Sequence, residues 1–294
     1  MLAAVLGALT IAFSAVLVRF ADTTPATAAI FRCLYALPPL ALLAWYERRR
    51  YGGRAAGQLR LAWIAGAFFA ADLVLWHHSI AEVGAGLATV LGNTQVVVVP
   101  IIAWVILGER PSWRVALSVP IVLLGVVLIS GVIGEGAYGA NPLLGVIFGV
   151  GTGVAYAGFI LVQRQANADD RRPAGPLFDA TLSAAIFSIL IGLPLGEVNL
   201  VPGWPSHGWL IILALGVQVI GWLFISVSLP RLPAAVTSVV LTIQPVGSVM
   251  LGIWLLAEDP SPFQLLGVLL ILAGLALTTL RVRVPWLRAT RPAV

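Results

Sequence analysis

The sequence predicts an all-α polytopic membrane protein with ten transmembrane helices, arranged as two inverted five-helix repeats. Three observations lead to this class: the composition, the spacing of the apolar runs, and a sequence repeat half a chain apart. Hydrophobic residues make up 60% of the 294 residues and charged residues 10%, whereas a soluble domain is nearer a quarter charged. A soluble core of this length does not require so much apolar surface, which favours the bilayer.

The apolar runs divide the chain into ten candidate spans, separated by proline, glycine and charged residues. Each run approaches the roughly 20 residues that a helix needs to cross the hydrocarbon core. The predicted spans are 2–18, 26–46, 61–81, 84–107, 113–133, 143–163, 176–195, 207–229, 233–256 and 262–280. The first run lacks the positive residues of a signal peptide, so we interpret it as a spanning helix. Gly145, Gly149 and Gly153 recur every four residues and predict a close-packing face.

All 17 basic residues are arginine, and their distribution sets the predicted orientation. With the N-terminus in the cytoplasm, fifteen arginines fall in cytoplasmic segments and only Arg19 falls in an outer loop. Because cytoplasmic loops of membrane proteins carry the excess of positive residues, we expect both termini to be cytoplasmic. The arginines lie in short loops between apolar runs, which indicates topology signals and excludes a nucleic-acid partner.

The repeat pairs residues 79–125 with 228–274 without a gap, at an offset of 149 residues. Gln95 matches Gln244, and LGERPS (107–112) corresponds to LAEDPS (256–261). Polar matches carry weight because polar residues are rare in membrane spans. Since each unit holds an odd number of spans, the second copy enters the membrane from the opposite side. We therefore predict inverted repeats over 1–137 and 138–294, an architecture that transporters use.

The repeated motif has a local interpretation of its own. A glycine can end a helix and a proline can begin the next one, so LGERPS is typical of a tight turn between two helices. We interpret its acid as a residue of the membrane interface, and the motif as a turn and not a site.

Arg32 and Asp72 are the two charged residues that the predicted spans place deep in the membrane. An unpaired charge there costs at least ~2.5–3.5 kcal/mol on insertion scales. Counted from the span ends at 1.5 Å per residue, the depths of the two residues differ by only ~5 Å. Three interpretations stay open. The two residues form a structural ion pair between two helices, directly or through water; or Arg32 binds a substrate carboxylate while Asp72 orients it or binds an ammonium group; or the side chains snorkel to the interface.

Other polar and aromatic residues at mid-depth are candidates for lining a substrate cavity. Successive side chains of WHHS (76–79) point about 100° apart, so they cannot all face one cavity. A spacing of four puts Thr89 with Asn93, and Ser238 with Thr242, on single helix faces. Hydrogen bonding between helices explains these residues equally well. The candidate cavity residues are Arg32, Tyr35, Asp72, Trp76, His78, Thr89, Asn93, Tyr156, Trp222, Ser238, Thr242 and Gln244.

Ten spans, a five-plus-five repeat, and LGE followed by a Pro-Ser turn resemble the drug/metabolite transporter superfamily, EamA type, over nearly the whole chain. The length and the WHHS segment are similar to YddG-like amino-acid exporters. The resemblance implies a bacterial inner-membrane exporter of amino acids, notably aromatic ones, with a cavity between helices 1–4 and 6–9. Family members carry a proline near the middle of helices 4 and 9. This chain has Pro245 in the ninth helix but Val96 in the fourth, so the resemblance implies a kink only in the ninth.

We therefore expect a monomeric inner-membrane exporter of amino acids and other small zwitterionic or apolar solutes that works by alternating access. Its partners are the solute and the bilayer, and we expect no cofactor and no metal. A multidrug or other metabolite transporter of the same superfamily is the alternative. An enzyme is disfavoured because the sequence has no HExxH, no GxSxG and no Cys–His pairing, with Cys33 as its single cysteine. A channel would need a continuous polar stripe, whereas polarity here clusters at mid-depth.

Overall fold

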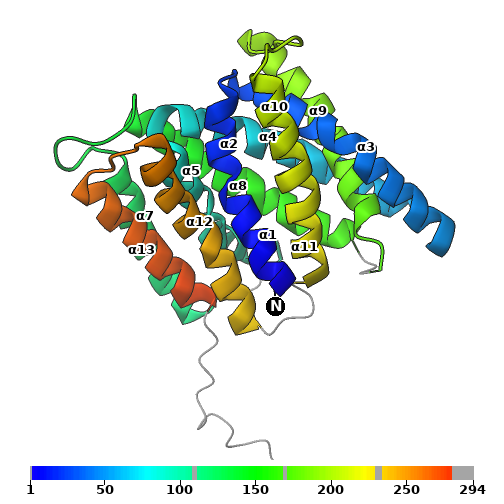
Figure 1. The fold of residues 1–294 in the computed structure, drawn as a ribbon. Coiled ribbons are helices and arrows are strands. Elements are labelled where there is room, and N and C mark those ends of the chain that lie inside the picture. The colour runs from blue at the N-terminus through cyan, green and yellow to red at the C-terminus, as the bar shows by residue number, and fades with distance from the viewer. Residues whose placement is uncertain (1, 108–110, 168–170, 229–233, 280–294) are drawn as a thin grey trace, which may run out of the picture.

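The computed structural model describes residues 2–107, 111–167, 171–228 and 234–279, and every regular element in this part of the chain is a helix (Figure 1). The elements are α1 (Leu2–Ala12), α2 (Ser14–Ala21), α3 (Pro25–Tyr51), α4 (Ala56–Val83), α5 (Ala85–Gly92), α6 (Gln95–Leu107), α7 (Trp113–Ile129), α8 (Pro142–Ala166), α9 (Ala174–Leu195), α10 (Ser206–Ile212), the π-helix η1 (Leu213–Gly221), α11 (Trp222–Ser228), α12 (Ala234–Leu256) and α13 (Pro262–Thr279). Within these residues, α1 and α2 together form one interrupted membrane crossing, as do α5 with α6, and α10 with η1 and α11. The predicted ten-helix, all-α class is confirmed.

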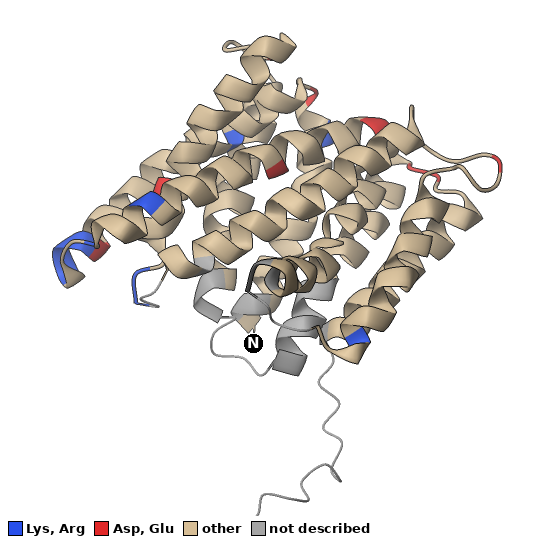
Figure 2. Ribbon diagram, turned by 180° about the vertical axis from the view of Figure 1, so that it is seen from behind, with Lys and Arg blue, Asp and Glu red and all other residues tan. Residues whose placement is uncertain are grey.

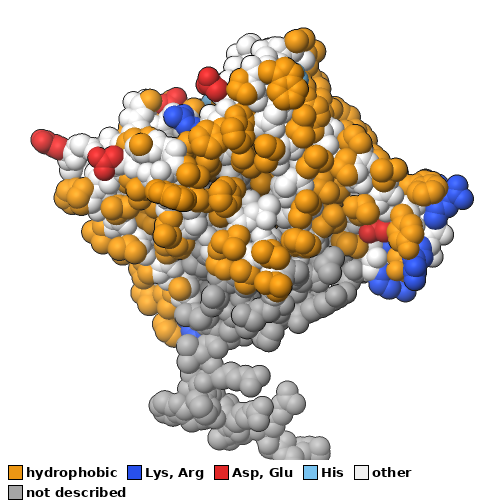
Figure 3. Space-filling view, viewed as in Figure 1, with side chains coloured by type: hydrophobic (Ala, Val, Ile, Leu, Met, Phe, Trp, Pro, Cys, Tyr) orange, Lys and Arg blue, Asp and Glu red, His pale blue; other side chains and the backbone are white. Residues whose placement is uncertain are grey.

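The exterior of the bundle is apolar, as a bilayer requires. Six helices of the described chain are long and apolar enough to cross a membrane, and four shorter apolar helices accompany them. Hydrophobic side chains cover most of the face in Figure 3, while charged side chains gather toward its ends. Trp254 is 80% exposed and Leu269 is 62% exposed. Because water would disfavour so large an apolar surface, the chain is a multi-pass membrane protein.

Charge is segregated between the two ends of the bundle. The N-terminus and most arginines lie toward one end in Figure 2, and most acidic residues lie toward the other. The arginine-rich end is defined here by Arg48, Arg49, Arg50, Arg54, Arg60, Arg114, Arg171 and Arg172. The acidic end is defined by Asp22, Glu82, Glu135, Glu197, Glu258 and Asp259.

The centre of the bundle is formed by α4, which packs along α8 and α9. The glycines of α8 permit this approach. A Cβ added to Gly145 would lie 2.6 Å from Cβ of Val83 at the end of α4, and one added to Gly149 would lie 2.6 Å from Cβ of Leu91 on the neighbouring α5 and 3.0 Å from Ser79 Oγ of α4. Real Cβ atoms essentially never come so close. The predicted close-packing face of the sixth span is confirmed.

The fifth helices of the two predicted repeats, α7 and α13, pack against each other in antiparallel directions. A Cβ added to Gly125 would lie 2.7 Å from the carbonyl oxygen of Gly267, and one added to Gly267 would lie 2.6 Å from that of Gly125. At the other end of the contact, Gly274 faces Val122 and Ser118. Under the offset of 149, Ser118 corresponds to Gly267 and Gly125 corresponds to Gly274. The contact between Gly125 and Gly267 is therefore equivalent to the contact between Gly274 and Ser118, with the two repeats exchanged. Inverted repeats require such an arrangement of equivalent helices.

Three crossings are interrupted near the middle of the bundle. The first breaks at Phe13, the fourth breaks at Asn93 and Thr94, and the eighth contains the π-helix η1. In the fourth crossing, Asn93 Nδ2 donates to the Thr89 carbonyl at 2.8 Å and Thr94 Oγ1 donates to the Leu91 carbonyl at 2.7 Å. Side-chain donors of this kind compete with the helical backbone for its carbonyls. The break therefore forms without a proline at this position, whereas α12 continues through Pro245.

Candidate functional site

A central cavity of about 90 Å³ lies where the interrupted helices meet α3, α4 and α8. Its lining combines two opposite charges, several aromatic rings and a set of amides and hydroxyls. The lining residues are Ile11, Ser14, Arg32, Phe69, Asp72, Leu73, Trp76, Thr89, Gly92, Asn93, Thr152, Tyr156, Trp222 and Gln244. Eight of the twelve residues predicted from the sequence are among them.

Arg32 on α3 supplies the positive charge of the cavity and is only 4% exposed. Its Nε donates to Gln218 Oε1 at 3.1 Å, and its Nη1 donates to Ser14 Oγ at 3.2 Å. The guanidinium carbon lies 5.8 Å from the ring centroid of Trp76. Neutral groups thus hold the guanidinium in place, so its positive charge is not cancelled by any of these contacts.

Asp72 on α4 supplies the negative charge and is 7% exposed. Among the described residues it forms no direct ion pair with Arg32, although both side chains line the same cavity. The two side chains therefore form no direct ion pair between α3 and α4 in this structure, while a structural role for the two charges stays a prediction. Neither side chain snorkels, because both are buried.

Aromatic rings form one wall of the cavity. Trp222 lies at the centre of this wall, with ring centroids 6.4 Å from Tyr156, 6.3 Å from Phe69 and 5.7 Å from Phe159, all in edge-to-face arrangements. Phe69 stacks on Phe159 at 4.6 Å. Such packing fixes each ring in place, so the wall presents a rigid apolar surface.

Helices α5 and α12 supply further polar residues of the lining. Thr89 accepts a hydrogen bond from Ser248 Oγ at 2.9 Å, which links the two helices. Asn93 follows directly after the last residue of α5, and Gln244 reaches the cavity from α12. The side chains of Ser238 and Thr242 lie outside the described residues.

Two predicted site residues lie away from the cavity. Tyr35 shares a hydrogen bond with His207 Nδ1 at 2.5 Å. His78 Nε2 lies 3.2 Å from Glu197 Oε1, and its ring stacks on Phe148 at 4.9 Å. Both residues thus join helices toward the acidic end instead of facing Arg32 and Asp72.

The structure adds polar residues that sequence reasoning did not single out: Ser14 and Thr152 line the cavity, and Gln218, which does not line it, holds Arg32. Gln218 is fully buried in η1 and contacts both Arg32 and Thr181 Oγ1, the latter at 3.4 Å. Ser14 begins α2 directly after the break at Phe13, and Thr152 reaches the cavity from α8. A glutamine inside an apolar span is the same signal that identified Gln244, so Gln218 could have been found in this way.

The turn LAEDPS (256–261) joins α12 to α13 at the acidic end of the bundle, and its acid is buried against neighbouring helices, which the sequence did not reveal. Glu258 is 4% exposed. Its carboxylate accepts backbone N–H hydrogen bonds from Ala85 at 2.5 Å and Gly86 at 3.1 Å. These are unpaired donors of the first turn of α5, where the helix dipole also favours a negative charge. The corresponding Glu109 lies outside the described residues.

Close backbone contacts accompany Glu258 at the acidic end. A Cβ added to Gly86 would lie 2.8 Å from Cα of Val249, and one added to Gly252 would collide with the Glu258 carboxylate. Burial, and then the nearby Glu258 charge, raise the pKa of the Tyr138 phenol, which therefore stays neutral at physiological pH. These contacts hold α5 against α12 at the acidic end.

Among the described residues, no group of three or more His, Cys, Asp or Glu side chains is arranged to hold a metal ion.

Comparison with known proteins identifies the family. The EamA-like transporter family model matches residues 1–131 and again residues 143–280. A solved structure described only as "Crystal structure of protein" shares 18% identity and superposes with a TM-score of 0.61, covering 96% of this chain and 97% of its own. No curated protein matches. The two matches of the family model together span most of the sequence, and the chain belongs to the EamA-like transporter family.

Proposed function

We propose that this transporter exports amino acids and other small zwitterionic or apolar solutes. The observation that carries the proposal is a cavity that contains a buried arginine and a buried aspartate with no direct ion pair between them. Each charge is costly to hold in an apolar interior, and a zwitterionic solute would compensate both at once.

The geometry supports one orientation of the solute. The α-carboxylate meets Arg32, whose guanidinium is held by neutral acceptors. The α-ammonium group meets Asp72. An apolar or aromatic side chain lies against the wall formed by Trp222, Tyr156 and Phe69, which favours aromatic amino acids in the manner of YddG-like exporters.

We further propose that transport proceeds by alternating access in a bacterial inner membrane, with both termini and the arginine-rich end in the cytoplasm. The antiparallel packing of α7 and α13 supports two halves of opposite orientation, 1–137 and 138–294, that exchange conformations. The contacts of Glu258 support an arrangement in which α5 and α12 are held together on the outer side.

Counterflow of labelled amino acids tests the substrate class. The chain is reconstituted into vesicles preloaded with unlabelled amino acid, and uptake of the labelled form is compared with that of empty vesicles. We expect accumulation for at least one aromatic or aliphatic amino acid. A flat response across a panel of all twenty amino acids would rule out the proposed substrate.

Two variants then test the site. Arg32→Gln removes the partner of the carboxylate, and the loss of a charge-assisted hydrogen bond of about 2 kcal/mol weakens binding roughly 30-fold. Asp72→Asn should weaken the binding of zwitterionic solutes in the same way. It should affect the binding of carboxylate solutes that lack an ammonium group less. Arg19→Gln is the matched control, because it removes an arginine that does not line the cavity. Equal transport by Arg32→Gln and Arg19→Gln, with both folded, would return Arg32 to a structural role.

A second candidate is export of flat cationic solutes, which the aromatic wall and Asp72 favour without any need for Arg32. Efflux of a fluorescent aromatic cation from vesicles separates the two candidates. Transport of the cationic solute should require Asp72 and be unchanged by Arg32→Gln, whereas transport of the amino acid should require both residues.

A further inference from the structure

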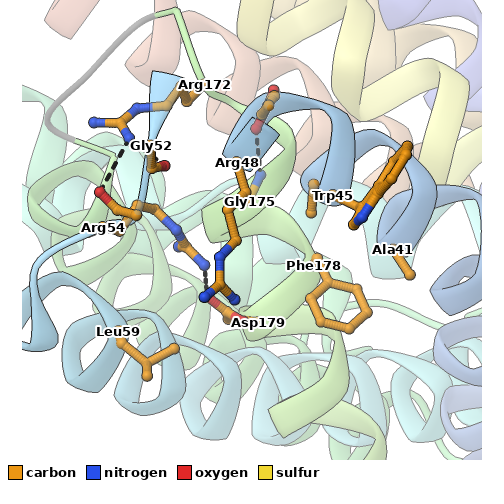
Figure 4. A pocket seen from close by; sticks show the side chains of 13 residues that line it. Ala41, Trp45, Arg48, Gly52, Arg54, Leu59, Arg172, Gly175, Phe178 and Asp179 are labelled. Atoms are coloured by element: carbon orange, nitrogen blue, oxygen red, sulfur yellow. Dashed lines mark hydrogen bonds and ion pairs between the residues drawn. The ribbon is translucent and has the colours of Figure 1, made fainter. Parts of the chain in front are cut away.

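A second pocket, separate from the central cavity, lies at the arginine-rich end between the last turns of α3, the loop that follows it and the first turns of α9 (Figure 4). Its volume is about 450 Å³, within the range of small-ligand sites. Trp45, Arg48, Arg54, Arg172, Glu47 and Asp179 supply its aromatic and charged lining. It shares no lining residue with the central cavity.

Both acids of the pocket are already engaged by the protein. Asp179 forms an ion pair with Arg54. Glu47 accepts hydrogen bonds from the backbone N–H groups of Ala174 at 2.9 Å and Gly175 at 2.8 Å, at the first turn of α9. These contacts fasten α9 to α3 and to the loop after it. Because both carboxylates take part in them, neither compensates the positive charge of the other arginines of the pocket.

The pocket retains positive charge and an unused donor. Within the part of the chain that the structure describes, the Arg48 guanidinium makes no hydrogen bond and no ion pair. Arg54 Nη1 is buried and has no hydrogen-bond partner, although an unsatisfied buried donor is unfavourable. Arg172 shapes the rim by donating from Nη1 to the carbonyls of residues 51–53, at 3.1–3.3 Å. Asp169 and Asp170 precede Arg171 in the sequence and lie outside the described residues.

The length of α3 places this pocket at the level of lipid headgroups. α3 has 27 residues, which extend about 40 Å at 1.5 Å per residue, whereas the hydrocarbon core is about 30 Å thick. The last turns, from about Trp45 onward, therefore project beyond the core. Trp45 is 57% exposed, with the Arg49 guanidinium 5.0 Å from its ring centroid, and tryptophan is typical of this interfacial layer. Exposed Leu42 and Leu59 provide adjoining apolar surface for acyl chains.

We propose that this pocket binds the phosphate of an anionic phospholipid headgroup, with the exposed Arg48 guanidinium as its donor and the Arg54 guanidinium as a second positive charge in the lining. Basic pockets between transmembrane helices bind acidic headgroups in this way, and arginine pairs with phosphate through several donors. The bound lipid would bridge α3 to α9, which the Glu47 and Asp179 contacts already hold together. The proposal does not depend on the identity of the transported solute.

Lipid binding to the purified full chain in non-ionic detergent tests the proposal by native mass spectrometry and by thermal unfolding. The probes are phosphatidylglycerol, phosphatidylcholine of the same chain length, and inorganic phosphate. We expect phosphatidylglycerol to bind and to raise the unfolding temperature, phosphatidylcholine to bind more weakly, and inorganic phosphate at the same concentration to have no effect.

Three variants locate the site. Arg48→Gln should weaken phosphatidylglycerol binding about fivefold, the contribution of one arginine near an anionic headgroup. Arg60→Gln removes an exposed arginine of the same end that does not line the pocket, and it should change affinity less than twofold. Ala44→Phe fills the pocket while every arginine is retained, and it should also weaken binding.

The proposal is overturned if Arg48→Gln and Arg60→Gln weaken binding equally, because general charge attraction would then explain it. Full binding by Ala44→Phe would exclude the pocket as the site. Binding of inorganic phosphate as tight as that of phosphatidylglycerol would assign the pocket to a soluble anion and not to a lipid.

Discussion

Replacing Glu258 with glutamine probes the contact between the α12–α13 turn and the first turn of α5. The carboxylate accepts two backbone N–H hydrogen bonds and is 4% exposed. Hydrogen bonds to a charged group contribute about 1.5–3 kcal/mol each, and neutral ones about 0.5–1.5 kcal/mol. The amide oxygen of glutamine can accept one of the two N–H groups, while its NH₂ group faces the other as a second donor. We therefore expect Glu258→Gln to lower the free energy of unfolding by about 2–4 kcal/mol.

The measurement is denaturation of the purified chain in mixed micelles of non-ionic detergent and sodium dodecyl sulfate, followed by circular dichroism. Asp259→Asn is the matched control, because Asp259 is the next residue of the same turn and is exposed. An exposed substitution of this kind should change stability by less than about 0.5 kcal/mol. If the two variants lose the same amount, the reasoning from the buried carboxylate is refuted.

Three further predictions follow from other contacts. Gly149→Ala should lower the free energy of unfolding by about 1–3 kcal/mol through overpacking, because its Cβ would meet Leu91; Gly57→Ala, with open space around its added Cβ, should not be destabilising in the same denaturation assay. Gln218→Glu places a carboxylate beside Arg32. Counterflow of carboxylate solutes should therefore fall at least tenfold, while transport of a cationic solute is retained. Undiminished amino-acid counterflow would show that Arg32 is not the carboxylate site. In a background without Cys33, the cysteine of Ser248→Cys should react faster with a membrane-impermeant thiol reagent when Glu258→Gln is also present. The reason is that Glu258→Gln weakens the contact that holds α5 to α12. Identical labelling rates would mean that Glu258 does not hold the acidic end closed.

The fold could be predicted from the sequence because each membrane crossing depends on a continuous apolar stretch of the chain, which is a local property of the sequence. The ten spans agree with the helices, and the glycine spacing of α8 correctly predicted a close-packing face. The breaks in the fourth and first crossings were not predicted. The break at Asn93 and Thr94 depends on hydrogen bonds from these side chains to carbonyls of their own helix, and most Asn and Thr residues in helices do not interrupt them.

The candidate site followed from the sequence only where polarity alone selects a residue. Arg32 and Asp72 are unusual in any apolar span, and both line the cavity. Trp76 also lines it, whereas His78, about 200° further around α4, contacts Glu197 instead. The direction in which a helix faces depends on its neighbours, which periodicity does not reveal in spans that are apolar on all sides. For the same reason the sequence did not reveal the burial of Glu258, since Ala85, whose N–H it binds in α5, is 173 residues away.

The π-helix η1 has a consequence for the charge in the cavity. A π-turn accommodates an extra residue relative to an α-helix, and rewinding η1 into an α-helix would rotate the following residues by about 100° per residue released. Gln218 lies inside this segment, so rewinding would swing its amide away from Arg32 and leave Ser14 as the remaining described acceptor of that guanidinium. The π-helical coiling of η1 thereby places one of the two described hydrogen-bond acceptors of the Arg32 guanidinium.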